Sequence, residues 1–404
     1  MKTFKIIFPL LFPLALSTQT DFRFDSVLYP TMYAKDLCAF LKANPKTLLI
    51  DVRSPGEFAD TSRYKNLNIG HLKNAWNISI DSIPKMLPEL KSHVNDPIIL
   101  YCSHSQRSRR VSKTLKENGF TQVRNLNGGL SWLNQAEEKD FPCKKEMIVS
   151  SLPYKTLPAK EAYEFIKADK NIFIVDVRRN SEFEGTDTVE LLNMGRIKGA
   201  VNISVDDIKN TMAPFEKHRN GRILLYDFGG EESNRAAEIL IQQGFKNVYT
   251  ILGGLSEMIG KDHETMQMRK ELLVNVPAYS ILNAKETLDL LSDPAIVILD
   301  IRPMDEYNNQ AKQFWRNLGR VKKAIHIQPS EFEVKIPGLL KYKHAAILVY
   351  GNRQAYKCCK HLKEAGFENV NIVYGGLWEL VSTSANIYGF KSLRSYFENN
   401  EGLY

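Results

Sequence analysis

The 404-residue sequence lacks the features that mark several large classes of protein. Neither a GxGxxG motif nor a P-loop accompanies its paired glycines, which argues against the usual phosphate-binding loops of nucleotide-dependent enzymes. Its formal charge of +8 is not gathered in a basic block or an aromatic-interleaved patch, so we expect no nucleic-acid partner. An apolar share of 43% and a charged share of 25% exclude disorder for most of the chain.

Cysteine is also scarce, with residues at positions 38, 102, 143, 358 and 359. Their odd number and irregular spacing do not fit a disulfide framework, so we expect at least one free thiol. Cys38 lies among apolar helix positions and is interpreted as a core residue, as are the adjacent Cys358 and Cys359. For Cys143, in a linker, an exposed resolving thiol is an open alternative. Cys102 is the thiol that the pattern singles out for chemistry.

The first residues have the anatomy of a secretory signal peptide. Two lysines precede an apolar run from Ile6 to Leu16, and small residues follow in an Ala15-x-Ser17 pattern. An uncleaved anchor is the alternative, but the run is about half of the roughly 20 residues that a membrane span needs, and two prolines interrupt it. We therefore expect residues 1–17 to be removed, export to the periplasm or the cell exterior, and no membrane span afterwards.

Three copies of one unit fill the rest of the chain. The segments LLIDVRSPGEF, FIVDVRRNSEF and VILDIRPMDEY align without gaps at Asp51, Asp176 and Asp300, so the copies are 125 and 124 residues apart (176 − 51 and 300 − 176). Further landmarks follow in register: Gly70, Gly195 and Gly319; Asn77, Asn202 and His326; Cys102, Asp227 and Gly351. A period of this size is a whole domain. The sequence predicts domains at 22–145, 150–272 and 275–395.

Within each copy, apolar runs of strand length alternate with helical patterns. TLLIDVR and PIILYC are continuous runs, as in strands buried on both faces of a parallel sheet. Val111, Leu115 and the stop at Gly119 follow a helical period. This alternation predicts an α/β fold in which each domain has a central parallel β-sheet flanked by helices on both faces.

Cys102 ends one such strand, at the sheet edge where α/β proteins bind ligands. A helix N-terminus, the loop N–H groups and Arg107 should favour its thiolate and also hold an anionic substrate. We therefore predict Cys102 as the catalytic residue, with the substrate bound by Ser103, His104, Ser105, Gln106 and Arg107. The C-x4-R spacing is one residue shorter than the C-x5-R of cysteine phosphatases, which favours sulfane sulfur over arsenate or phosphate esters.

With these motifs the chain resembles the rhodanese family. IDVRSPGEF, NIGHLKNAWNIS, the strand-Cys-loop-helix and NGFTQVRNLNGGLSWL match that family's landmarks in order. The resemblance implies a sulfurtransferase that needs no metal or organic cofactor. It would move sulfane sulfur from a small anionic donor such as thiosulfate, through a Cys102 persulfide, to cyanide or a thiol. The loop departs from the family, because neither a basic residue after the cysteine nor an internal glycine is present.

Other recurring residues are interpreted as structural. Asp51 and Arg53 recur in all three copies, which predicts a structural ion pair. His71 is replaced by Arg196 and Arg320, so we expect it to make a structural hydrogen bond. For His104, tuning of the thiolate and simple exposure to solvent are both open.

The second and third copies carry Asp227 and Gly351 in place of Cys102, so neither can carry sulfur. We predict that both are catalytically silent and that they frame the first domain, stabilise it or bind a partner. The alternative to an enzyme is an exported binding or relay module, in which Cys102 exchanges persulfide or disulfide with a partner protein.

Overall fold

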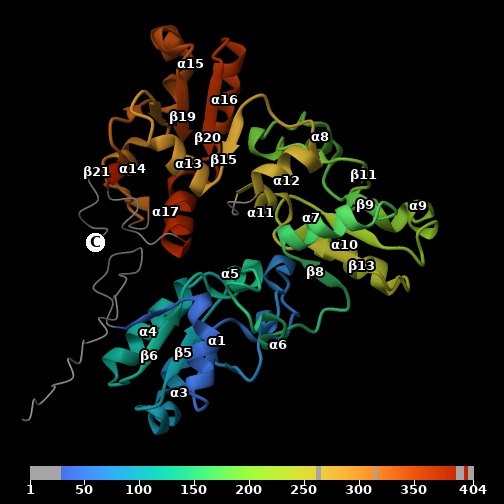
Figure 1. Cartoon of the computed structure of the whole chain (residues 1–404), viewed down its shortest axis with the longest axis vertical. Helices are drawn as coiled ribbons and strands as arrows, with labels where there is room; N and C mark the ends of the chain where they lie inside the picture. Colours follow the sequence, from blue (N-terminus) through green and yellow to red (C-terminus); the bar gives the residue numbers. More distant parts are fainter. Residues whose placement is uncertain (1–28, 261–264, 314–315, 388–394, 399–404) are drawn as a thin grey trace, which may run out of the picture.

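The computed structural model describes residues 29–260, 265–313, 316–387 and 395–398. The predicted signal peptide, residues 1–17, lies outside this part of the chain. Among the described residues, no helix combines the length and the apolar character that crossing a membrane requires. Three α/β domains follow one another, with the first at the bottom of Figure 1, the second at the right and the third at the top.

Each domain is built on a five-stranded sheet in which all paired strands run parallel, and the spatial order is the same in all three. In the first domain the order is β1 (Thr31–Met32), β6 (Val123–Leu126), β5 (Ile98–Tyr101), β2 (Leu48–Asp51) and β4 (Trp76–Asn77). In the second it is β8 (Lys155–Leu157), β13 (Val248–Ile251), β12 (Ile223–Tyr226), β9 (Phe173–Asp176) and β11 (Val201–Asn202). In the third it is β15 (Ser280–Leu282), β20 (Asn369–Val373), β19 (Ala346–Tyr350), β16 (Val297–Asp300) and β18 (Ile325–His326). The predicted parallel-sheet repeat is confirmed.

Helices connect these strands. The first domain has α1 (Ala34–Ala43), α2 (Pro55–Phe58), α3 (Ile83–Leu90), α4 (Gln106–Glu117), α5 (Gly129–Gln135) and α6 (Lys144–Met147). The second has α7 (Ala159–Ala168), α8 (Asn180–Glu184), α9 (Ala213–Glu216), α10 (Glu231–Gln242), α11 (Gly254–Gly260) and α12 (Thr265–Leu272). The third has α13 (Ala284–Leu291), α14 (Met304–Tyr307), α15 (Phe332–Leu339), α16 (Gln354–Glu364) and α17 (Gly376–Ile387).

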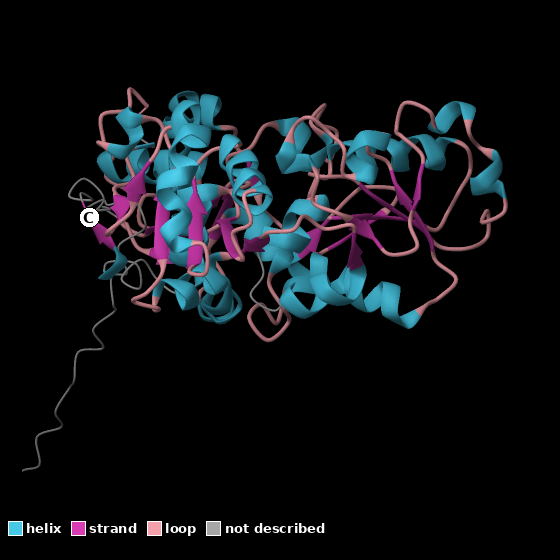
Figure 2. Cartoon of the chain, turned by 90° about the horizontal axis from the view of Figure 1, so that it is seen from above, coloured by secondary structure: helices cyan, strands magenta, loops and turns pink. Residues whose placement is uncertain are grey.

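The continuous apolar strands are explained by burial on both faces of each sheet. In β5, Leu100 packs in one core with Leu115 of α4, whereas its neighbour Ile99 packs in a second core with Leu37 of α1. Successive side chains of a strand point to opposite faces, so both sets of positions must be apolar. Figure 2 shows helices on either side of the strands. The flanking helices on both faces are thus confirmed.

The segment that follows the last helix of each domain closes that domain in the same way. It forms a short strand that pairs antiparallel with the strand after the Asp-x-Arg motif. The pairs are β3 (His71–Leu72) with β7 (Ile148–Val149), β10 (Arg196–Ile197) with β14 (Leu273–Val274), and β17 (Arg320–Val321) with β21 (Phe397–Glu398). The linkers are therefore held by the domain that they leave.

The cysteines differ in part from the sequence prediction. Cys38 of α1 forms a disulfide with Cys143, 105 residues away, so the interpretation of Cys38 as an unpaired core residue is wrong, and Cys143 is not a resolving thiol. Folding brings α1 beside the segment after α5, and the spacing of the cysteines in the sequence could not reveal this. Cys102, Cys358 and Cys359 are free and buried, which confirms a free thiol and the core position of the adjacent pair.

We expect reduction of the Cys38–Cys143 disulfide to lower the free energy of unfolding of the first domain by roughly 2–4 kcal/mol, because the bond closes a long loop in the unfolded chain. Urea unfolding with and without a reductant measures the loss. The Cys38→Ser/Cys143→Ser double variant is the control, since its stability should not respond to the reductant. Titration of five rather than three thiols in the unfolded, unreduced protein would contradict the pairing.

Candidate functional site

Cys102 is the first residue of the loop between β5 and α4, and only 1% of its surface is exposed. The amides of Leu130 and Ser131 donate to the carbonyl oxygens of Cys102 and Ser103, at 2.9 and 3.0 Å. A Cβ atom on Gly129 would lie 2.4 Å from the Cys102 carbonyl oxygen, so only glycine permits this approach. The paired glycines Gly128 and Gly129 therefore form a turn that supports the loop.

The hydroxyl of Ser108, on the first turn of α4, lies 3.7 Å from the sulfur of Cys102 as a donor. The same hydroxyl lies 2.7 Å from Oδ1 of Asn125 and 3.1 Å from the Ser105 carbonyl oxygen, so its single proton is shared among three acceptors. Ser108 and Asn125 are both fully buried. The sequence prediction missed Ser108, although a serine six residues after the strand-end residue recurs in the second domain as Ser233.

Arg107 lies beside the loop, and Glu57 of α2 holds it. Two guanidinium nitrogens donate to the Glu57 carboxylate at 2.6 and 2.7 Å, and one of them also donates to the Ser103 hydroxyl at 3.1 Å. Burial alone would raise the pKa of Glu57, but hydrogen bonds from Arg107 and Ser54 outweigh it and lower that pKa to about 2. Hydrogen bonding to Glu57, together with the nearby Cys102, raises the pKa of Arg107. Arg107 is thus a fixed cation, and contact with a donor anion stays a prediction.

The remaining loop residues divide into two groups. Ser103 and Ser105 are buried, and the Ser105 hydroxyl donates to the Leu126 carbonyl oxygen at 2.6 Å, which ties the loop to β6. His104 and Gln106 are exposed at the surface. Ser105 has a φ of 68°, a left-handed conformation that turns the chain into α4. Roles in substrate binding for these four residues stay predictions.

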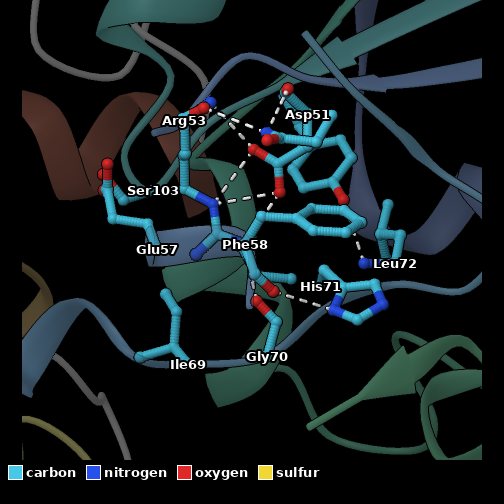
Figure 3. A network of polar contacts seen from close by, with 12 residues as sticks. Asp51, Arg53, Glu57, Phe58, Ile69, Gly70, His71, Leu72 and Ser103 are labelled. Carbon is cyan, nitrogen blue, oxygen red and sulfur yellow. Dashed lines mark hydrogen bonds and ion pairs between the residues drawn. The ribbon is translucent and has the colours of Figure 1, made fainter. Parts of the chain in front are cut away.

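A buried ion pair at the end of β2, the strand next to β5, ties that strand to the turn before β3, as Figure 3 shows. The guanidinium of Arg53 lies 2.7 Å from the Asp51 carboxylate and donates to the Gly70 carbonyl oxygen at 2.6 Å, and both side chains are fully buried. The same pair recurs as Arg178 with Asp176 and as Arg302 with Asp300, each at 2.6 Å. The predicted structural ion pair is confirmed in all three domains.

His71 also has the structural role that the sequence predicted. Its Nδ1 lies 3.0 Å from the Phe58 carbonyl oxygen, and its ring stacks on that of Phe58 (Figure 3). In the second domain, Arg196 donates to the corresponding carbonyl oxygen of Phe183 at 2.8 Å. A histidine and an arginine thus hold the same turn in the two domains.

In the second domain, three hydrogen-bond donors of this loop meet the side chain in the position of Cys102, although burial still raises the pKa of that Asp227 carboxyl. The Asp227 carboxylate, in the position of Cys102, is 2% exposed and accepts hydrogen bonds from the amides of Gly230 and Glu232 at 2.8 and 2.9 Å and from the Ser233 hydroxyl at 2.7 Å. Gly230 has a φ of 85°, in the same left-handed region as Ser105. In the first domain the corresponding donors are the amides of Ser105 and Arg107 and the hydroxyl of Ser108. We call these three groups the anion cradle of Cys102, because they occupy the positions of the donors to Asp227 and the Ser108 hydroxyl lies 3.7 Å from the sulfur.

The pair formed by Glu57 and Arg107 has no equivalent in the second domain. Glu232 stands in the position of Arg107, and Glu182, in the position of Glu57, is paired with Arg179 at 2.8 Å. Burial, together with the charges of Asp227 and Glu182, raises the pKa of Glu232 to about 7. An anion added to the second domain would find these donors already bonded to Asp227, with the carboxyl groups of Glu182 and Glu232 nearby.

The third domain has lost the cradle by a different route. Gly351, which has no side chain, directly follows the strand β19. Helix α16 then begins at Gln354 after only two intervening residues, whereas three residues separate Cys102 from α4. The two cysteine-free loops thus differ from the first for separate physical reasons, and their catalytic silence stays a prediction.

A family model described as "Rhodanese-like domain" matches residues 34–136, 158–261 and 283–382, once in each domain. Among curated proteins, the tRNA uridine(34) hydroxylases of Salmonella arizonae and of an Enterobacter species are 28% identical over 125 residues. These alignments cover 30% of this chain and 35% and 36% of those proteins. The chain therefore spans about a third of the length of the curated relatives it matches.

Two solved structures are similar to this chain, with low TM-scores and low sequence identities. A thiosulfate sulfurtransferase from Pseudomonas aeruginosa is 14% identical with a TM-score of 0.23, covering 88% of this chain and 65% of that one. An anaerobic ergothioneine biosynthesis enzyme from Chlorobium limicola is 14% identical with a TM-score of 0.27, covering 87% and 96%. Both likenesses are too weak to carry a functional assignment.

The raised pKa of Glu232 makes the stability of the second domain depend on pH. Between the ordinary pKa of 4.5 and about 7, the folded state keeps a proton that the unfolded state has lost, so this group lowers stability as the pH rises through that window. We expect Glu232→Gln to stabilise the domain by about 1 kcal/mol at pH 8, a value reduced for partial solvent screening, and not at all near pH 4.

Differential scanning calorimetry at both pH values measures this effect. Glu164→Gln, which removes the same charge from an exposed position on α7, is the matched control and should change little at either pH. An equal gain from Glu232→Gln at pH 4 and pH 8 would show that protonation is not the cause.

Proposed function

The chain belongs to the family of rhodanese-like domains, and on that premise we propose that it is a sulfurtransferase with one active domain in three. Family membership supports a sulfur-transfer role. The observation that supports the proposal is the anion cradle, because the loop positions whose groups donate to Asp227 recur beside Cys102, where the Ser108 hydroxyl lies 3.7 Å from the sulfur. Such a loop can stabilise a thiolate and the negative charge of a persulfide.

The proposed reaction is a double displacement. The Cys102 thiolate attacks the outer sulfur of a donor such as thiosulfate, so that a Cys102 persulfide forms while the donor's S–S bond breaks and sulfite leaves with the bonding electrons. An acceptor, cyanide or a thiolate, then attacks the outer sulfur of the persulfide and Cys102 leaves as a thiolate. The two displacements balance without an external oxidant, a metal or an organic cofactor.

The residues around Cys102 would have separate roles in this reaction. The loop amides and Ser108 would stabilise the persulfide charge, and Arg107, held by Glu57, would orient the anionic end of the donor. Thiosulfate is the donor we propose first, since it is small and doubly charged and Cys102 is almost fully enclosed.

Export is part of the proposal. The Cys38–Cys143 disulfide supports it, because disulfides persist in oxidising compartments such as the periplasm or the cell exterior. The tRNA named in the curated relatives is not carried over, since the shared 125 residues amount to a single domain.

Intact-mass spectrometry after exposure to thiosulfate or mercaptopyruvate tests the proposal. We expect the protein to gain one sulfur atom, and the Cys102→Ser variant to gain none and to lose turnover to background. Cys358→Ser is the matched control, because burial raises the pKa of that thiol to about 12 and makes it inert. A persulfide or retained turnover in the Cys102→Ser protein would contradict the assignment.

The Ser108 hydroxyl should contribute to the rate separately. We expect Ser108→Ala to lower kcat/KM for sulfur transfer roughly 10- to 100-fold, near the value of one lost donor to a developing charge. Ser112→Ala is the matched control, since Ser112 is also fully buried on α4, one turn further from Cys102. Equal losses in the two variants, or none in Ser108→Ala, would remove Ser108 from the site.

A further inference from the structure

The same contact joins each pair of successive domains. Helix α10 of the second domain packs on the 3-10 turn η1 (Lys65–Leu67) of the first, and α16 of the third packs on the turn η4 (Glu190–Leu192) of the second. In both cases the contributing helix is the one that follows the loop of Cys102, Asp227 or Gly351. One helix face is therefore used twice as a docking surface for a 3-10 turn.

Each contact contains an ion pair between the helix and the turn, and the two charges are exchanged between the first contact and the second. Lys65 of η1 pairs with Glu238 of α10 at 2.8 Å, and Glu190 of η4 pairs with Lys360 of α16 at 3.5 Å. Lys65 and Glu190 are equivalent, since each lies 14 residues after the aspartate of its motif (65 − 51 and 190 − 176). The geometry is kept while the two charges are exchanged.

Within the described part of the chain, the same helix face of the first domain has no contact of this kind with another domain. Phe120, Phe245 and Phe367 follow the three helices, and seven residues before them lie Lys113, Glu238 and Lys360. Lys113 on α4 has 67% of its side chain exposed and makes only a loose pair with Glu117 at 4.0 Å, whereas Glu238 is 30% exposed. Figure 1 shows α4 on the side of the first domain that faces away from the second.

The charge of this face is positive. Arg109 occupies the position of Asn234, whose amide donates to the Lys65 carbonyl oxygen across the first contact. Arg110 and Lys116 also lie on α4, so the helix that starts at the Cys102 loop carries five cations when Arg107 is included. From Gln106 to Lys113 the helix rises only about 10 Å, which keeps any docked molecule next to the loop.

We propose that this face of α4, centred on Lys113, docks an acidic turn of a separate protein that exchanges sulfur with Cys102. The α16 contact is the model, because there a lysine at the same position meets a carboxylate on a 3-10 turn. The exchange rests on the proposed function: a partner cysteine thiolate attacks the outer sulfur of the Cys102 persulfide, the new persulfide forms on the partner, and Cys102 leaves as a thiolate.

A second copy of this chain is a poorer occupant. The turn η4 is already covered by α16, and η1 is both covered by α10 and basic at Lys65. In the third domain the residues flanking the equivalent position are Lys312 and Arg316, which have the same sign of charge as α4. Charge complementarity therefore favours a different, acidic protein.

Two peptides taken from this chain serve as matched probes. Residues 186–194, TDTVELLNM, include η4 and have a net charge of −2, and residues 61–69, TSRYKNLNI, include η1 and have a net charge of +2. In fluorescence anisotropy at low salt, we expect the full-length protein to bind the acidic peptide at least ~10-fold more tightly than the basic one. Neither peptide contains cysteine, so binding is measured independently of sulfur chemistry.

Variants of the full chain locate the site. Arg110→Glu/Lys113→Glu, which reverses two exposed charges one helical turn apart, should abolish the preference for the acidic peptide, and Lys113→Glu alone should reduce it. Lys35→Glu/Lys42→Glu on α1, which packs in the core on the other face of the sheet, is the matched control and should keep the preference. Equal loss in the control would show general charge steering and overturn the proposal, as would an unchanged preference in the α4 variants.

Sulfur transfer separates this proposal from the proposed function. With a cysteine added to the acidic peptide, we expect kcat/KM for persulfide transfer to it to fall about 10-fold in the α4 variants, while transfer to cyanide is unchanged. Failure of Cys102 to load sulfur would refute the proposed function. The peptide-binding measurements would then still test the docking face by themselves. If α4 were required for binding a single-stranded RNA, and the RNA bound more tightly than the acidic peptide, the proposal that the partner is a protein would be overturned.

Discussion

The buried pair of Asp51 and Arg53 is the interaction on which each domain depends. A charge without a partner at that depth would cost several kcal/mol, so every acceptor and donor around it must be satisfied. Arg53 meets this demand by bonding both the Asp51 carboxylate and the Gly70 carbonyl oxygen, which joins the end of a central strand to the turn beyond it. Glu57 follows directly on α2 and holds Arg107 beside the cysteine. The ion pair thus positions the site without entering it.

The loop between β5, β12 or β19 and the next helix differs among the three domains in the residue at the position of Cys102. In the first domain it surrounds a thiol, in the second the Asp227 carboxylate takes its donors, and in the third the loop is shorter and the position is glycine. All three domains keep the sheet and the ion pair. The chemistry is therefore separable from the fold, since the strand and helix that form the cradle are stabilised by their own cores.

The contacts between domains follow the same logic. The pairs of Lys65 with Glu238 and of Glu190 with Lys360 occupy equivalent places with exchanged charges, so the packing of a helix on a turn defines the contact and the charges define which surfaces fit. The first domain is the only one whose equivalent helix is not covered by a preceding domain within the described chain. It is also the domain that carries the thiol.

The sequence by itself determined the features that arise from local pattern. Gapless repetition of the aspartate motif gave three domains, continuous apolar strands gave a parallel sheet, and the position of Cys102 between strand and helix gave the candidate nucleophile. Only the tertiary structure decided which distant groups meet. The disulfide of Cys38 with Cys143, the pairing of Arg107 with Glu57 and the sharing of the Ser108 proton with Asn125 join residues 105, 50 and 17 positions apart. Sequence spacing does not determine such contacts, because they form only when helices and strands pack on the two faces of the sheet.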